Sequence, residues 1–366
     1  MVEDSFDDIR ILARTNTQTR RLGYVKQICR FLTDEPCPRL TLIKRLEEWS
    51  ERNQYHLEAH INSSGIIRPS GKSLGAKRYI DLANDLELVT DASGYLRLTK
   101  TGRILLSVER NEPSSELRPF WLSPGQRLVF VYQLLLRDRD YLLPIFKLAS
   151  QYHRQPELLE HTQAALLEHF DIIKRKTVSQ IIRAQASERR STFRGWTKPV
   201  KYSEHVTIPR LHWLLDLEVL DWQAFRECKE FRPSNIGRVL IESIPNIEGH
   251  LFVNREWCQN ELFRVWADGL KAPYEQWGKL SISRKRSLIK FYVSTGFSLF
   301  RTMEYPRISA YQLVLFTVIE LLLVEKILAG FEDVKQALSK YSDSSHEGWI
   351  FYWSELDDDG YVLLPR

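Results

Sequence analysis

Apolar and polar residues follow one another in residues 78–107 in an order that predicts a helix, a short β-hairpin and the start of a second helix. The apolar residues of the first part have the spacing of one buried helix face: Tyr79, Leu82, Ala83 and Leu86. Residues 87–90 and 95–99 are expected to be short strands, because the turn-forming sequence DASG (91–94) lies between them. Thr99 is then expected to cap a helix that continues to Leu106.

The same order of elements is predicted a second time, in residues 210–243. The segment LELV (86–89) matches LEVL (217–220), and GRIL (102–105) matches GRVL (237–240). Repetition of a short pattern in the same order indicates two related structural modules.

This order resembles a winged helix-turn-helix, in which a recognition helix is followed by a wing hairpin and an exit helix. In the first copy the exit helix opens with the residues that carry the resemblance: Leu98, Thr99, Gly102 and Arg103. The resemblance covers roughly 30 residues of each copy. It implies that each recognition helix enters the major groove of DNA, while the wing and a basic loop contact phosphates. Residues 53–72 depart from the family pattern, because they place a long segment before the first recognition helix.

Elsewhere the apolar spacing predicts mostly helices. They are expected over about residues 20–33, 40–52, 124–176, 257–266, 283–300 and 331–339, with strands over 349–353 and 361–364. The predicted fold class is mainly α with small β-hairpins (α+β), with tandem winged-helix modules joined by a helical spacer. The expected parts are an N-terminal winged-helix module (1–112), the helical spacer (113–176), a second winged-helix module with a basic loop (177–245), and a C-terminal helical region that ends in a hairpin (246–366) and is a candidate for a third, degenerate module.

Positive charge is concentrated just before the second copy. The whole chain has a formal net charge of only +5, but residues 171–210 contain ten basic and three acidic residues, a net charge of +7. Phe193, Trp196 and Tyr202 lie among the basic residues. Basic residues interleaved with aromatic ones suit contact with a phosphate backbone, with the rings packing on sugars or anchoring the loop.

The second recognition helix is expected to begin at Thr207, with Arg210, His212 and Trp213 facing outward. In the first module Ser73 is expected to cap the recognition helix, which brings the neighbouring lysines close to phosphates. The predicted DNA-contacting residues are Lys72, Lys77 and Arg78 in the first module, and Lys174, Arg175, Lys176, Arg189, Arg190, Arg194, Lys198, Lys201, Arg210 and His212 in or before the second.

Other patterns suggest catalytic or metal chemistry only weakly. His56 and His60 do not have the His-Glu-x-x-His order of a zinc hydrolase, and SGKS (70–73) lacks the first glycine of a phosphate loop in register. The aspartates of DDDG (357–360) are explained by a hairpin turn. Four widely spaced cysteines favour a reducing compartment over a zinc site. No cofactor, metal site or catalytic residue is predicted.

The longest apolar run, residues 310–330, is long enough to span a bilayer, but Glu320, Glu325 and Lys326 interrupt it. We interpret it as a buried core helix or a dimer helix, and we expect no membrane partner. The acidic N-terminus lacks an apolar signal core, so the expected location is the cytoplasm.

The leading functional hypothesis is non-enzymatic, sequence- or structure-directed binding of double-stranded DNA, as the recognition subunit of a regulatory, defence or mobile-element system. The first alternative is a scaffold subunit, whose 310–330 helix and C-terminal aromatic residues (Trp349, Phe351, Tyr352 and Trp353) dock a protein partner or a second copy. The second alternative is a magnesium-dependent nuclease of the restriction type, with Asp216 or Asp221 upstream of Glu227 and Lys229.

Overall fold

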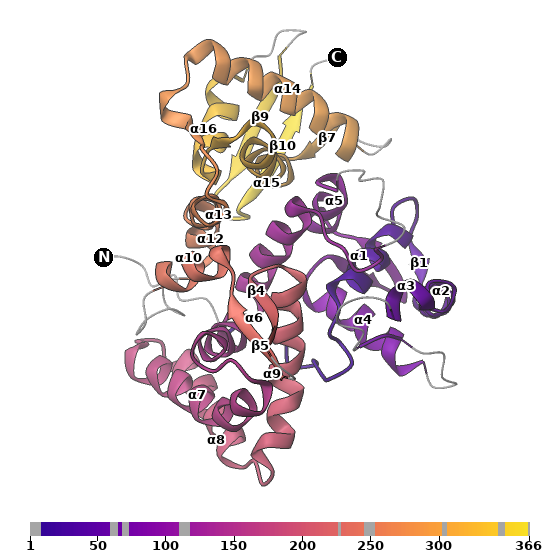
Figure 1. Ribbon diagram of the computed structural model, residues 1–366. Helices are drawn as coiled ribbons and strands as arrows, with labels where there is room; N and C mark the ends of the chain where they lie inside the picture. Colours follow the sequence, from indigo (N-terminus) through magenta and orange to yellow (C-terminus); the bar gives the residue numbers. More distant parts are fainter. Residues whose placement is uncertain are drawn as a thin grey trace.

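The computed structural model of the protein describes residues 9–58, 65–67, 73–109, 118–225, 228–244, 253–301, 306–342 and 348–364. It is mainly helical, with 65% helix and 11% strand, and its antiparallel sheets have only two or three strands. The predicted fold class, mainly α with small β-hairpins, is therefore confirmed. The parts of the chain are arranged around one long central helix, α6, with the N-terminal unit on its right, the C-terminal unit above it and helices α7 and α8 below it in Figure 1.

The N-terminal unit is a small helical bundle with a three-stranded sheet on one side. Its elements are α1 (Leu22–Phe31), β1 (Cys37–Pro38), α2 (Arg39–Arg52), α3 (Gln54–Glu58), α4 (Leu74–Asp85), β2 (Val89–Ala92), β3 (Tyr95–Leu98) and α5 (Lys100–Ser107). The strands are antiparallel in the order β1-β3-β2. Thr99 caps α5 as predicted, since the Gly102 main-chain N–H donates to its hydroxyl at 3.0 Å.

Helix α6 (Pro124–Gln151) packs against α5 of the N-terminal unit, α7 and α9 of the middle of the chain, and α12 and α15 of the C-terminal unit. Its start is fixed by a capping box between Ser123 and Gln126. Most of its side chains are buried, so this segment, predicted as a spacer, is the central helix of the whole structure.

The middle of the chain contains three helices, a hairpin and a further helix: α7 (Gln155–Lys176), α8 (Gln180–Arg194), α9 (Pro199–Asp216), β4 (Leu220–Phe225), β5 (Cys228–Pro233) and α10 (Asn235–Ser243). The predicted start of a helix at Thr207 is wrong, because α9 begins at Pro199 and includes Pro209 in its interior. Pro209 has no N–H to offer the carbonyl of His205. The Thr15 hydroxyl donates to that carbonyl instead, at 3.4 Å.

The two predicted copies do fold alike. In each, a residue with positive φ, Glu87 (+52°) or Glu218 (+55°), lies two positions after the end of a helix, and a hairpin and a capped helix follow. The strands of the second hairpin are six residues long, and those of the first are four. Ser234 caps α10 in the way that Thr99 caps α5, by accepting a hydrogen bond from the main-chain N–H of Gly237.

The C-terminal unit begins with α12 (Arg255–Asn260) and α13 (Leu262–Leu270) and continues through β6 (Glu275–Gln276), η1 (Trp277–Lys279), α14 (Ile282–Phe300), β7 (Arg307–Ser309), α15 (Ala310–Glu320), η2 (Leu321–Glu325), β8 (Ile327–Leu328), α16 (Phe331–Lys340), β9 (Ile350–Ser354) and β10 (Asp359–Leu363). Strands β7, β10 and β9 form an antiparallel sheet in the order β7-β10-β9. The first strand, which directly precedes a helix, pairs with the last one, as β1 pairs with β3. The three-stranded sheets of the two units therefore share one strand order, although the C-terminal unit also contains α12, α13 and the parallel pair β6–β8.

The apolar run 310–330 is a core element rather than one long helix. Residues 310–319 of α15 are buried within this chain, and a π-helical turn ends the helix before Lys326, whose φ is +56°. Because its side chains are already covered, α15 does not form the docking surface expected of the scaffold alternative. Within the part of the chain that the structure describes, no helix is long and apolar enough to cross a membrane.

Candidate nucleic-acid interface

The basic residues that follow Asp171 lie on the last turns of α7, along α8 and on the first turn of α9. Nine of them form what we call the basic surface: Lys174, Arg175, Lys176, Arg183, Arg189, Arg190, Arg194, Lys198 and Lys201. Six of the nine are exposed, and Lys174, Arg189 and Arg190 are half-buried. The predicted basic cluster is thus present at the surface of the molecule, at the end of α7 and α8 below α6 in Figure 1.

The sequence of α8 sorts its residues onto two faces. Ile182, Ala186 and Phe193 are buried and belong to a small core with residues of α7. The helical repeat then places Arg183, Arg190 and Arg194 in one line beside this buried face. This line is about 16 Å long at the rise of an α-helix. Because duplex DNA carries one negative charge per roughly 1.7 Å of its axis, such a line can meet several phosphates.

Few acidic side chains neutralise the basic surface. Asp171 forms an ion pair with Arg190 (2.6 Å), and the other acids between residues 171 and 204 are Glu188 and Glu204. Arg183 donates to the main-chain oxygen of Thr177 at 2.8 Å, a contact that leaves its charge in place. Nine basic residues against three acidic ones leave a net charge of +6 on this part of the molecule.

The aromatic residues of this region serve mainly to anchor the connection between α8 and α9. Phe193 is buried, and its ring meets that of Trp196 edge-on at 5.1 Å between centroids. Trp196 in turn lies 5.8 Å from the ring of Tyr202, which is 43% exposed. Phe193 and Trp196 therefore anchor the loop between α8 and α9. Tyr202 keeps an exposed face that could pack on a sugar.

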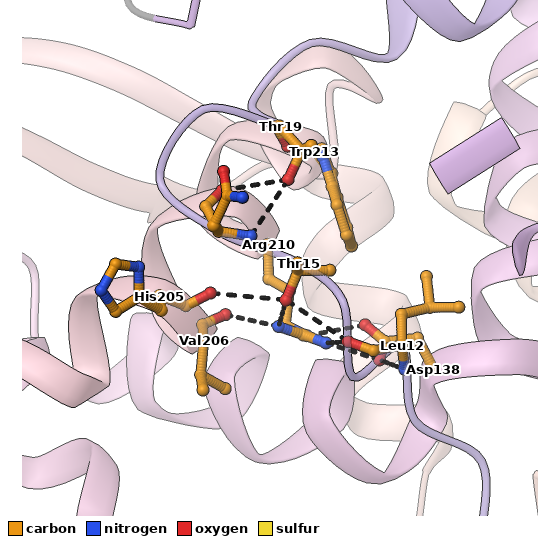
Figure 2. Close-up of polar contacts among 9 residues, drawn as sticks. Leu12, Thr15, Thr19, Asp138, His205, Val206, Arg210 and Trp213 are labelled. Atoms are coloured by element: carbon orange, nitrogen blue, oxygen red, sulfur yellow. Dashed lines mark hydrogen bonds and ion pairs between the residues drawn. The ribbon is translucent and has the colours of Figure 1, made fainter. Parts of the chain in front are cut away.

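Arg210, His212 and Trp213 do not face solvent, so the prediction that they contact DNA from an outward helix face is wrong. Arg210 and Trp213 are completely buried, and His212 is 3% exposed. The Trp213 indole N–H donates to the carbonyl of Thr19 at 2.8 Å (Figure 2). The physical reason for Arg210 and Trp213 is that the N-terminal segment, residues 9–21, crosses over their side of α9 and covers it.

Arg210 is the centre of a buried polar cluster that ties α9 to α6 and to the N-terminal segment. Its Nε and Nη2 atoms donate to the Asp138 carboxylate at 2.6 and 2.7 Å, and its Nη2 also donates to the Leu12 carbonyl at 3.2 Å (Figure 2). Asp138 in addition accepts from the Leu12 main-chain N–H at 2.8 Å. Elsewhere on the same segment and helix, Arg21 and Asp216 form a second buried pair at 2.8 Å. These contacts are structural, and no sequence motif predicted them.

The predicted residues of the first module are not brought together with the basic surface. Lys77 is exposed, and Arg78 is half-buried and donates to the side chain of Gln18 at 3.2 Å. Asp81, on the same helix, forms an ion pair with Arg39, which reduces the positive charge there. Helix α4 lies well apart from α8 in Figure 1. Lys72 lies outside the described residues.

Ser73 precedes α4 but does not cap it, contrary to prediction. Its backbone is left-handed, with φ of +46°, and its hydroxyl makes no hydrogen bond to the first turn of the helix. The hydroxyl donates instead to the carboxylate of Glu47 on α2, at 3.0 Å. The start of α4 is therefore held by a tertiary contact.

The structure offers little support for the nuclease or metal patterns. Burial raises the pKa of Asp216 to about 6, and its carboxylate is occupied by Arg21 and by the main-chain N–H of Leu22. Glu227 and His60 lie outside the described residues. Among the residues that the structure does describe, no group of three or more histidine, cysteine, aspartate or glutamate side chains is placed to hold a metal ion.

Comparisons with known protein families, with curated proteins and with solved structures found no match to this chain.

Proposed function

We propose that this protein binds double-stranded DNA without catalysing a reaction, and that the basic surface on α7, α8 and α9 is its main contact with the phosphate backbone. The observation that carries the proposal is the net charge of +6 on an exposed surface in a chain whose total is +5. A surface of this kind gives electrostatic binding that depends on phosphates rather than on base sequence.

The topology of the N-terminal unit adds support. Its order of helix, strand, helices and hairpin, with the first strand paired to the last, is the order that the winged-helix resemblance implies. The three-stranded sheet of the C-terminal unit has the same strand order. Because Arg210 and His212 are buried, the proposal assigns the contacts of the middle unit to the exposed cations on the last turns of α7, on α8 and at the start of α9.

The test measures the affinity of the protein for a random-sequence duplex by gel retardation and by fluorescence anisotropy, at several salt concentrations. The variant Arg183→Glu/Arg194→Glu/Lys198→Glu reverses three exposed charges of the basic surface and changes the formal net charge from +5 to −1. We expect its affinity at low salt to fall by about tenfold or more. A plot of the logarithm of the association constant against the logarithm of the salt concentration has a negative slope. The magnitude of this slope should be smaller by about one for each phosphate that the variant no longer binds.

The matched control, Lys44→Glu/Arg45→Glu/Lys340→Glu, makes the same change in net charge at exposed positions of α2 and α16. It should retain most of the affinity. Equal weakening in both variants would show that net charge alone matters and would reject the basic surface as the site. A wild-type protein that retards no duplex at low salt would reject the proposed function itself.

A further inference from the structure

A second basic surface lies on the C-terminal unit, over helix α14. Residues 276–301 contain six basic residues and no acidic residue: Lys279, Arg284, Lys285, Arg286, Lys290 and Arg301. No stretch of this length without an acidic residue occurs in the first basic surface, where Asp171, Glu188 and Glu204 lie among the cations. It lies outside both of the repeated hairpin units that the sequence pattern identified.

The packing of α14 directs part of this charge to solvent. Ile289, Val293 and Phe297 are buried on its inner side, and α14 packs there against α15 and α16. Gly296 allows the close approach, because a Cβ atom there would lie 2.4 Å from the side chain of Leu313. The apolar inner face fixes which residues of α14 remain outside.

The outer face of α14 combines cations, hydroxyls and an aromatic ring. Ser283, Arg286, Lys290 and Ser294 follow one another at intervals of three or four residues and are all exposed, so they form one line along the helix. Phe291, beside this line, is 58% exposed. Arginine, lysine and serine side chains are donors that commonly contact phosphate oxygens.

The cations of α14 differ in their surroundings. Arg284 forms an ion pair with Glu275 at 2.6 Å, and the Lys285 ammonium lies 5.4 Å from the centre of the Trp277 ring. Arg286 and Lys290 lie together on the exposed line, one helical turn apart. Because both are exposed cations of this line, a test should concentrate on these two residues.

The helix that occupies the recognition position of the C-terminal unit is less suited to a polyanion. Helix α16 begins with Glu332 and Asp333, and the Lys335 ammonium lies 3.3 Å from Glu332 and 3.0 Å from Glu355. In this unit it is thus α14, and not the helix before the hairpin, that presents a positive face.

The two basic surfaces are separated in space and by charge. Helices α14 and α8 lie on opposite sides of α6, at the top and the bottom of Figure 1. The sequence from the start of α10 to the end of α13, residues 235–270, contains five acidic and three basic residues. There is thus no continuous basic track through this segment that would lead one duplex from the first surface to the second.

We propose that α14 forms a second nucleic-acid-binding surface and that one molecule of the protein bridges two separate duplex segments. The inference rests on the proposed function, because it takes duplex DNA as the ligand of both surfaces. It adds a mode of action, which is to hold two stretches of DNA near one another.

The test is a capture assay in which duplex DNA on beads retains a second, fluorescent duplex only when the protein is added. Wild-type protein should capture the second duplex. The variant Arg286→Glu/Lys290→Glu should retain about tenfold less fluorescent duplex on the beads, or less still. The same variant should still retard a single duplex through the first surface. The control Lys44→Glu/Lys340→Glu, which makes the same change in net charge, should behave as the wild type.

The outcomes separate this inference from the proposed function. A wild-type protein that retards no duplex overturns the proposed function. A wild-type protein that retards a duplex but captures no second one, or an Arg286→Glu/Lys290→Glu variant that captures as well as the wild type, overturns the bridging role of α14. Light scattering completes the test: if the wild type is a dimer and this variant a monomer, α14 is a self-association surface and the inference is wrong.

Discussion

Glu87 and Glu218 hold the same place in two copies of one structural unit, and each forms an ion pair with an arginine of the central helix α6. Glu87 pairs with Arg137, and Glu218 pairs with Arg127. Both glutamates have a left-handed backbone, with φ of +52° and +55°. The two copies are therefore alike not only in their internal fold but also in the way they pack against α6.

A second equivalence lies two residues earlier in each copy. Asp85 ends α4 and Asp216 ends α9, and each lies near an arginine of the N-terminal segment. Asp216 pairs with Arg21 at 2.8 Å, and the positive charge of Arg14 acts on Asp85. The segment 9–21 thus brings an arginine near the same position of each copy, and at Asp216 that arginine forms an ion pair.

The shared fold predicts that one substitution will have the same effect in both copies. A Cβ atom on Gly102 would lie 2.1 Å from the carbonyl oxygen of Leu88, and one on Gly237 would lie 2.1 Å from that of Val219. Gly102→Ala and Gly237→Ala should each lower the free energy of unfolding by about 1–3 kcal/mol, because the backbone must shift to make room. Thermal unfolding measures the effect. Gly278→Ala, where a Cβ atom meets nothing within 4 Å, is the control and should change stability very little.

Removing one partner of the buried Arg210–Asp138 pair should be strongly destabilising. Arg210→Met leaves the Asp138 carboxylate uncompensated in the interior, so the free energy of unfolding measured in urea should fall by about 3–5 kcal/mol. Asp138→Leu/Arg210→Met should recover part of this loss, since no unpaired charge remains. A single variant as stable as the wild type would contradict the structural role of the pair. Because Arg210 is buried, the salt dependence of DNA binding by folded Arg210→Met should match that of the wild type.

Lys26 should make stability depend on pH in the alkaline range. Burial, with a contribution from nearby Arg30, lowers the pKa of Lys26 to about 8, and its ammonium donates to the Trp121 carbonyl at 2.6 Å. Between pH 8 and the unfolded-state pKa of about 10.5, the unfolded chain binds more protons at this site than the folded chain does. Stability therefore rises with pH across this range.

The measurement compares wild type with Lys26→Met at pH 7 and pH 10. The wild type should gain about 2–3 kcal/mol relative to the variant as the pH rises. The comparison removes the effects of other groups that titrate in the same range. A constant difference between the two proteins would show that the Lys26 ammonium is not held in a desolvated site.

Asp359 should stabilise the contact between the N-terminal and C-terminal units at neutral pH and lose this effect in acid. Burial alone would raise its pKa, but Lys100 of α5 and the main-chain N–H groups of Tyr311 and Gly360 together lower the pKa below its usual value. A carboxyl group with a depressed folded pKa contributes stability above its unfolded pKa, about 3.9, and loses it as the pH falls. Asp359→Asn should therefore be less stable than the wild type at pH 7, with a difference that shrinks below pH 4. Asp357→Asn, at an exposed turn position, serves as the control in thermal unfolding.

Much of the local structure could be predicted from the sequence. The helices at 22–31, 39–52 and 331–340 and the hairpin at 350–363 lie within a few residues of their predicted positions. The turn between β2 and β3 has positive φ at Ser93 and Gly94, in agreement with its predicted turn chemistry. These features depend on residues close together in the chain, and the spacing of apolar residues reports them directly.

The candidate site was predicted only in part. The exposed cations of α7 and α8 follow from a charge count, since a surface helix keeps its charged residues on the solvent side. The buried pairs of Arg210 and Arg21 could not be found in this way. The one signal was the charged run RDRD (137–140), four charged residues between apolar segments of one helix, which indicates that partners must come from elsewhere in the chain.

The sequence by itself determined the kinds of elements, their order, the repetition of one unit and the concentration of positive charge before the second copy. Only the tertiary structure decided which faces of these elements are covered. Helix α9 continues through Pro209, and Thr15, distant in the chain, hydrogen-bonds to the His205 carbonyl to which residue 209 offers no N–H. Arg210 and Trp213 are buried because residues 9–21 cross over them. Periodicity reports only the local chain, whereas burial depends on contacts between residues that are far apart in sequence.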